Sequence, residues 1–144
     1  MTPSKQPFFV DGPVRPESIA EQISRQQKFR KRGAHAIFLG QVRADEKEGK
    51  RVKEIVYSAY QAMAEREIEK IRLAMMEKFG LDELEIFHSL GTVRAGEISL
   101  FVLASSGHRK AALSSIEEIV NTIKTNVPIW KKEILEDQSH RWVE

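Results

Sequence analysis

The sequence predicts an α+β fold with a mainly antiparallel sheet and helices packed on one face of it. Two observations support this: helical and strand-like segments interleave along the chain, and most of the strands come in neighbouring pairs. A third is negative, because neither GxGxxG nor GxxxxGK[ST] occurs. The 144 residues fit one domain, residues 1–144, which can bury ~68–70% of its unfolded surface.

The first elements are a short apolar run, Phe8 to Val10, and a helix. Pro16 opens the helix and acidic Glu17 follows, which suits a first helical turn. We expect the helix to continue to about Gln27. The basic run from Lys28 to Arg32 comes next, and a solvated helix end is the simpler interpretation of it.

Two strands and a loop are expected in the next part of the chain. Ala34 to Val42 is apolar with Gly40 inside, which predicts a buried strand with a bulge or a close backbone approach. The polar stretch from Ala44 to Arg51, around Gly49, predicts an exposed loop. Val52 to Tyr60 alternates in polarity and is expected to pair with the first of these strands.

The strongest helical pattern lies between Gln61 and Phe79, where apolar residues recur near the 3.6-residue period. Gly80 supplies the stop for this helix. Two further strands follow, Leu84 to Leu90 and Glu97 to Ser105, joined by the glycine-bounded turn from Gly91 to Gly96. They are expected to form an antiparallel hairpin.

The last helix has an apolar face and a polar start. The apolar face comprises Leu113, Ile116, Ile119 or Val120, Ile123 and Val127. Ser105 or Ser106 is a plausible N-cap, which leaves backbone N–H groups beside His108 and Arg109. Such a helix start can bind an anion, although an ordinary capped helix is the simpler interpretation.

Pro128 separates two lysines in the segment that ends this helix. Because proline has no N–H and pushes Val127 out of the helical region, the helix carrying Lys124 ends and an extended run carrying Lys131 begins. Ammonium groups on opposite sides of such a bend can converge on one pocket; the alternative is two solvated surface lysines. In a strand, Lys132 would face away from Lys131.

Composition excludes several kinds of chemistry. With no cysteine, the chain has no disulfide and no thiol nucleophile, so any sulfur must arrive on another molecule. The four histidines show no close metal-ligand spacing, and we expect neither a metal nor another cofactor. A net charge of +2 argues against non-specific nucleic-acid binding. No apolar run approaches the ~20 residues of a membrane span, and Met1 to Pro7 is unlike a signal peptide, so we expect a cytoplasmic protein.

Several separated motifs occur in the order found in one family. They are Phe38-Leu39-Gly40-Gln41-Val42-Arg43, Gly96-Glu97, His108-Arg109-Lys110-Ala111-Ala112, Ile123-Lys124, Pro128-Ile129-Trp130-Lys131-Lys132-Glu133 and Arg141-Trp142-Val143-Glu144. From about Ala34 to the last residue, the chain resembles the large, catalytic subunit of molybdopterin synthase. The spacing of Lys124 and Lys131 also matches that family.

The resemblance implies an α/β-hammerhead fold and a homodimer of large subunits. It further implies one small ubiquitin-like sulfur-carrier subunit docked on each, which makes a heterotetramer. The implied activity is that of a sulfurtransferase in molybdenum cofactor biosynthesis. The small subunit's C-terminal Gly-Gly tail, carried as a thiocarboxylate, donates sulfur to precursor Z, the cyclic pyranopterin monophosphate. Two transfers give the molybdopterin dithiolene.

The resemblance also assigns roles to individual residues. Lys124 is the first choice for the central catalytic residue, where it would stabilise an oxyanion or shuttle a proton near the thiocarboxylate carbon. Lys131 is the second, and would hold the phosphate or the opened intermediate. Substrate binding is assigned to one pocket made by Arg43, His108, Arg109, Lys124 and Lys131, with Arg141 as a weaker candidate.

Two positions depart from the family pattern. Ser58-Ala59-Tyr60 replaces a Glu followed by His-Tyr or a similar pair, and Ser89 replaces the usual arginine after the histidine of the hairpin's first strand. The rival interpretation is a non-enzymatic RNA-binding α+β domain that uses Lys28 to Arg32 and Lys47 to Lys53, although no RNP-type aromatic strand and no GXXG loop are present. A third is a scaffold that binds a ubiquitin-like tail without catalysis.

Overall fold

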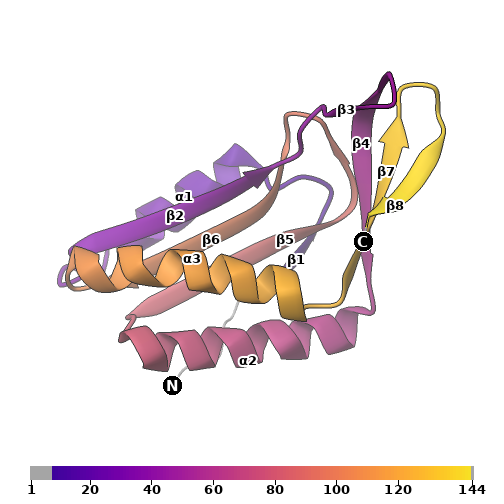
Figure 1. Ribbon diagram of the computed structural model, residues 1–144. Helices are drawn as coiled ribbons and strands as arrows, with labels where there is room; N and C mark the ends of the chain where they lie inside the picture. The colour runs from indigo at the N-terminus through magenta and orange to yellow at the C-terminus, as the bar shows by residue number, and fades with distance from the viewer. Residues whose placement is uncertain (1–7, 144) are drawn as a thin grey trace.

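The computed structural model describes residues 8–143 (Figure 1). Met1 to Pro7 and Glu144, both used above, lie outside this range. The elements are β1 (Phe9–Asp11), α1 (Pro16–Gln26), β2 (Ala34–Gln41), β3 (Glu46–Lys47), β4 (Lys50–Ala59), α2 (Gln61–Phe79), β5 (Glu83–Arg94), β6 (Ile98–Ser106), α3 (Arg109–Asn126), β7 (Ile129–Leu135) and β8 (His140–Val143). Apart from the parallel pair β1–β5, the described strands pair antiparallel, so the predicted α+β class is confirmed.

The sheet has two parts that share β5. Its strand order is β2-β6-β5-β4-β7-β8, with β1 paired to β5 and β3 paired to β4. The first half of β5 pairs with β6, and the second half pairs with β4. Gly91 lies where the partner changes and has a φ of 84°, a conformation that glycine adopts at little cost. Figure 1 shows β4, β7 and β8 at a steep angle to β2, β6 and β5.

Helices cover both faces of the first part of the sheet. On one face, Ile86 and Val102 pack with α2 and α3 in the larger core. On the other face, Phe87 and Phe101 pack with Ile19 of α1. The prediction that all helices lie on one face is therefore wrong for α1 (Figure 1). The physical reason is that β6 is apolar at successive positions and β5 carries Phe87 directly after Ile86, so both faces of this part of the sheet have apolar side chains that must be covered.

The helix limits agree closely with the sequence signals. α1 begins at Pro16, and α2 ends at Phe79 before Gly80, whose φ of 67° is left-handed. α3 ends at Asn126, and Val127 is extended before Pro128, as predicted. No helix within residues 8–143 is long and apolar enough to cross a membrane.

The strand pairing differs from the prediction. β4 does not pair with β2; it lies between β5 and β7. β2 instead pairs with β6 and forms an edge of the sheet, so its side chains alternate between half-buried and exposed rather than being buried throughout. The predicted irregularity is present, because the register of β2 shifts between Gly40 and Gln41.

Two turns also differ from the prediction. The segment expected to be a loop is a hairpin of β3 and β4, and Glu48 and Gly49 both have positive φ, as a two-residue type I′ turn requires. The predicted antiparallel pairing of β5 with β6 is confirmed, but β5 continues through Gly91 to Arg94, so the turn is shorter than expected. On α3, Leu113 is exposed, and Ala112 and Ser115 are buried in its place.

Candidate active site

Lys124 and Lys131 line the same small cavity, at the junction of α3 and β7. The other residues that line it are His88, Leu100, Ile123, Val127 and Ile129. Its volume is about 40 Å³, which has room for a few water molecules at most. The two lysines that flank Pro128 therefore do converge, as the sequence predicts.

The local backbone explains this convergence. Val127 leaves the helix with extended dihedrals, and the N–H of Ile129 bonds to the carbonyl of Val127 at 2.9 Å. β7 then pairs with β4, which places Lys131 directly opposite Tyr57. The chain thus turns from helix to strand within three residues, and Lys124 in the last turn of α3 stays close to Lys131.

The cavity is positively charged and partly dehydrated. The pKa of Lys131 is lowered from its usual value, first by burial and then by the charge of Lys124, while Glu133 opposes the shift. Within residues 8–143, neither Lys124 nor Lys131 forms an ion pair with a carboxylate. An incoming anion would therefore meet two cations that are not already neutralised.

His88 is a member of this site that the sequence analysis did not select. It lies on β5, is buried, and has a pKa lowered to about 4. Burial is the largest cause, and Lys131 and Lys124 add repulsion, whereas a hydrogen bond to Ser89 opposes the shift. The ring is therefore neutral near pH 7. A sequence signal existed, because His88 is a titratable residue that directly follows the apolar pair Ile86-Phe87 in a predicted strand.

His108 and Arg109 lie at the opposite end of α3. Together with Gly33, Gly107 and Lys110 they line an open hollow. Of the two predicted capping serines, Ser106 does bond to the helix start: its Oγ accepts from the N–H of Ala112 at 3.2 Å and donates to the carbonyl of His108. Ser105 does not; its Oγ donates to Gln26 of α1 at 3.1 Å.

The length of α3 keeps its two ends apart. Arg109 and Lys124 are 15 residues apart on one helix, which at 1.5 Å per residue is about 22 Å. A single pocket that contains both residues cannot exist within one protomer. The predicted five-residue pocket thus divides into a lysine site, with Lys131 half-buried and Lys124 exposed, and a second exposed site at the helix start.

Arg43 and Arg141 are both ion-paired. Arg43 follows β2, is exposed, and pairs with Asp45 at 3.1 Å. Arg141 lies on β8 opposite Glu133, and its Nε donates to Glu133 Oε1 at 2.9 Å. Neither arginine lines the lysine cavity. Each guanidinium is therefore partly neutralised by a carboxylate, which weakens its attraction for an anionic substrate.

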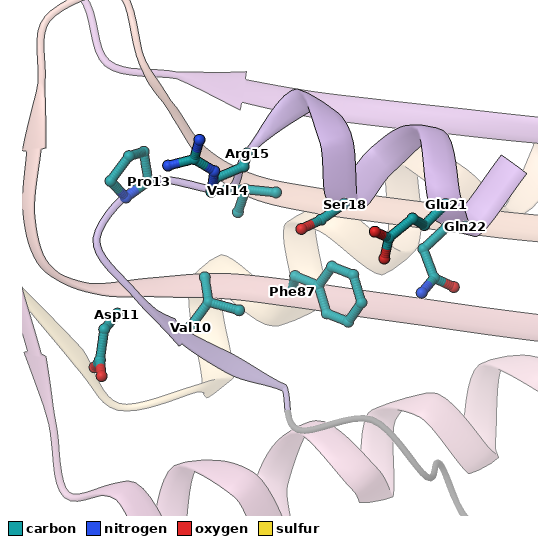
Figure 2. A pocket seen from close by; sticks show the side chains of 9 residues that line it. All are labelled: Val10, Asp11, Pro13, Val14, Arg15, Ser18, Glu21, Gln22 and Phe87. Carbon is teal, nitrogen blue, oxygen red and sulfur yellow. The ribbon is translucent and has the colours of Figure 1, made fainter.

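A larger cleft lies on the other face of the sheet, between α1, β1 and β5 (Figure 2). Its volume is about 190 Å³, and Figure 2 shows Phe87 next to Ser18 and Gln22. Because Phe87 and His88 are neighbours on one strand, their side chains point to opposite faces. This cleft is therefore separated from the lysine cavity by the sheet.

A comparison with known protein families identifies the family to which the chain belongs. The family model described as MoaE protein matches residues 10–126. The chain belongs to the MoaE family. Within the match lie Arg43, His108, Arg109 and Lys124, whereas Lys131 and Arg141 follow it.

Named relatives in the MoaE family agree with this. The chain is 42% identical to the molybdopterin synthase catalytic subunit of Bos taurus over 110 residues, 76% of this chain and 58% of the relative. It is 38% identical to that of Pyrococcus abyssi over 112 residues, 78% and 74% of the two chains. The chain thus spans a little more than half of the bovine relative and about three quarters of the archaeal one.

Solved structures show the same fold. Molybdopterin synthase from Staphylococcus aureus superimposes with a TM-score of 0.83 at 33% identity and covers 98% of both chains. The complex of subunits 1 and 2 of molybdopterin-converting factor from Helicobacter pylori gives 0.80 at 23% identity, covering 94% of this chain and 88% of that one. The second likeness concerns the fold alone.

Proposed function

We propose that the protein is the large, catalytic subunit of a molybdopterin synthase that acts in the cytoplasm. The reaction would be sulfur transfer from a thiocarboxylated Gly-Gly tail of a small ubiquitin-like subunit to precursor Z. Membership of the MoaE family and relatives named as catalytic subunits support the activity. The observation that carries it is the cavity in which Lys124 and Lys131 meet without a carboxylate partner.

The two lysines would have different parts in this reaction. Lys124 would lie near the thiocarboxylate carbon and stabilise the negative charge that develops on its oxygen. Lys131, whose pKa is lowered, releases a proton more readily than an ordinary lysine and would hold the substrate's anionic group or move a proton. Both roles require water to be largely excluded. Leu100, Ile123 and Val127 supply an aliphatic lining, and the incoming tail would have to cover Lys124, which is exposed in the free protein.

A homodimer would reunite the two separated sites. If Arg109 and Lys124 contact one pterin, they must come from different protomers, because about 22 Å separates them in one chain. α3 packs beside β2, which is an edge of the sheet and carries exposed Ile37 and Leu39. Two β2 edges that pair about a two-fold axis would set the α3 helices antiparallel and bring the start of one near the end of the other. One small subunit on each protomer would complete the heterotetramer.

Reconstitution tests the proposed function. The protein is mixed with thiocarboxylated small subunit and precursor Z, and molybdopterin is measured. Lys124→Ala should abolish sulfur transfer and leave the dimer and small-subunit binding intact. Lys132→Ala is the matched control, because Lys132 lies on the opposite face of β7, with its Nζ 5.6 Å from the Trp142 ring centre. Near-normal molybdopterin formation by Lys124→Ala would contradict the catalytic role of Lys124. If the wild-type protein binds the tail but forms no product, it is a scaffold instead.

A further inference from the structure

His88 is held rigidly beside the two lysines. It is 6% exposed and lies on β5, where Phe9 and Tyr57 meet its ring edge-on with centroids 6.0 and 5.2 Å away. Tyr57 is itself fixed, because its hydroxyl donates to Ser99 Oγ at 3.1 Å. An aromatic ring packed in this way has little rotational freedom, so its nitrogens have set positions.

The hydrogen bonds determine which ring nitrogen carries the proton. Nδ1 of His88 is 2.7 Å from the backbone carbonyl oxygen of Ser89. A carbonyl oxygen only accepts, so Nδ1 must donate. Because the ring is neutral, Nε2 carries no proton and is a hydrogen-bond acceptor.

Nε2 of His88 differs from the other side-chain groups that line this cavity, because it can accept a hydrogen bond. The other lining residues are four aliphatic residues and two lysines, and an ammonium group offers donors only. Among the side chains that line the cavity, His88 is therefore the one that can accept a hydrogen bond from a charged lysine. The charge of Lys131 acts on the His88 ring more strongly than that of Lys124, and Lys131 lies opposite Tyr57, which contacts the ring. The structure of residues 8–143 has no hydrogen bond between His88 and Lys131, so the bond would form when the lysine side chain turns to Nε2.

The charged groups around the His88 ring do not supply another side-chain acceptor for the Lys131 ammonium. Lys124 of α3 and Lys131 of β7 face the ring, and Tyr57 of β4 packs against it. Glu133 of β7 is the nearest carboxylate to act on Lys131, but it already accepts from Arg141 at 2.9 Å and pairs with Lys47 at 3.5 Å. Glu133 therefore acts on Lys131 from a distance.

We propose that His88 is a positioning residue whose Nε2 accepts a hydrogen bond from the Lys131 ammonium and fixes that lysine in the cavity without adding negative charge. The inference rests on the proposed function, because an anionic tail and substrate need the cavity to stay positive. A carboxylate at this place would orient the lysine equally well, but it would neutralise the cation and repel the thiocarboxylate. A neutral acceptor avoids both effects.

Site-resolved acylation of lysines tests the contact without any sulfur transfer. The intact protein is treated with acetic anhydride over a range of pH, and the acylation of Lys131 is measured by peptide mass spectrometry. His88→Phe keeps a ring and removes the acceptor, and His88→Gln keeps a neutral acceptor. In His88→Phe the amine of Lys131 should react roughly tenfold faster below its pKa, because a hydrogen bond to a charged group is lost. His88→Gln should stay near wild type.

Lys132 is the internal control in every digest, because it lies on the other face of β7 and its reactivity should not change. If His88→Phe does not fold, His88→Leu serves as a second acceptor-free variant. Equal Lys131 reactivity in wild type, His88→Gln and the acceptor-free variants would overturn the inference. The same increase in His88→Gln and His88→Phe would also overturn it, because loss of packing would then be the cause.

Reconstituted sulfur transfer separates this inference from the proposed function. With His88→Phe, kcat should fall and the pH profile of kcat should move to lower pH, and both should recover in His88→Gln. A fall in kcat with unchanged Lys131 reactivity would overturn the positioning role and leave the proposed function intact. A changed Lys131 reactivity in a protein whose wild type makes no molybdopterin would support the His88 contact and overturn the proposed function.

Discussion

The two ends of α3 carry similar side chains but border different hollows. At its start, His108 and Arg109 are exposed around an open hollow. At its end, Lys124 is also exposed, but it borders a cavity of about 40 Å³ beside Lys131, whose pKa is lowered by burial. A charge in water is screened and can bind an anion reversibly, whereas a charge in a dry cavity acts more strongly and shifts its neighbours. We therefore expect the start of α3 to bind the substrate and the end of α3 to take part in sulfur transfer.

Substitutions at the two ends of α3 should affect different kinetic constants. Lys124→Ala should lower kcat by roughly 10²–10³, because a cation that faces developing negative charge is lost. Arg109→Ala should instead raise KM for the pterin by roughly tenfold or more with little change in kcat, since it would remove a charge-assisted contact. Steady-state kinetics of the reconstituted enzyme measure both. A similar kcat loss in the two variants would show that the ends are not functionally distinct.

Mixing these variants tests whether the ends belong to different protomers. The assay uses pterin well below the wild-type KM, where Arg109→Ala alone should keep only about a tenth of wild-type activity. Lys124→Ala and Arg109→Ala chains, unfolded and refolded together, should then recover roughly a quarter of wild-type activity, because half of the dimers are mixed and each mixed dimer has one intact site. The separately refolded variants are the controls. If the mixture is only as active as the average of the two separately refolded variants, both residues belong to a site that one protomer completes.

The stability of the protein in acid tests whether His88, next to the lysine cavity, is buried as a neutral ring. Since the pKa of His88 is lowered from 6.5 to about 4, the unfolded chain binds the proton first, and the native state loses stability as pH falls from 6.5 to 4. That loss should amount to about 3 kcal/mol and be complete below pH 4. His88→Gln should lack this component in urea unfolding across pH. His140→Gln, at an exposed position on β8, should follow wild type.

The smallest expected effect concerns the support of the exposed end. A Cβ on Gly33 would lie 2.4 Å from the carbonyl oxygen of Gly107, so Gly33→Ala must displace the backbone next to His108. We expect a loss of about 1–3 kcal/mol in the free energy of unfolding and a higher KM for the pterin. Gly107→Ala is a matched control, since its Cβ would meet nothing nearer than 3.9 Å. Acylation of Lys131 should be the same in both variants.

Local signals in the sequence indicated that Lys124 and Lys131 could share one cavity, but two surface lysines remained the alternative until the family resemblance was added. Pro128 stops a helix through its own ring and missing N–H, and this effect does not depend on the rest of the fold. The end of α2 at Gly80 is of the same kind. The MoaE resemblance was confirmed, and it rests on short motifs whose order survives without knowledge of the fold.

Strand partners could not be predicted in this way. β4 pairs with β5 and β7 because β5 changes partner at Gly91, and a strand's own residues do not record which edge it will join. The ion pair of Arg141 with Glu133 likewise depends on the register of β7 with β8. The separation of Arg109 from Lys124 was within reach, since the expected helix was already long enough to keep them apart.

The macrodipole of α3 also bears on the proposed dimer. An α-helix has a macrodipole, with about half a positive charge at its start and half a negative charge at its end. In the proposed dimer, antiparallel α3 helices would oppose and partly cancel their dipoles, which favours their association. Each shared site would lie between the positive pole of one helix and the negative pole of the other. A substrate there would experience a directed field set by the backbone, which no side-chain substitution would remove.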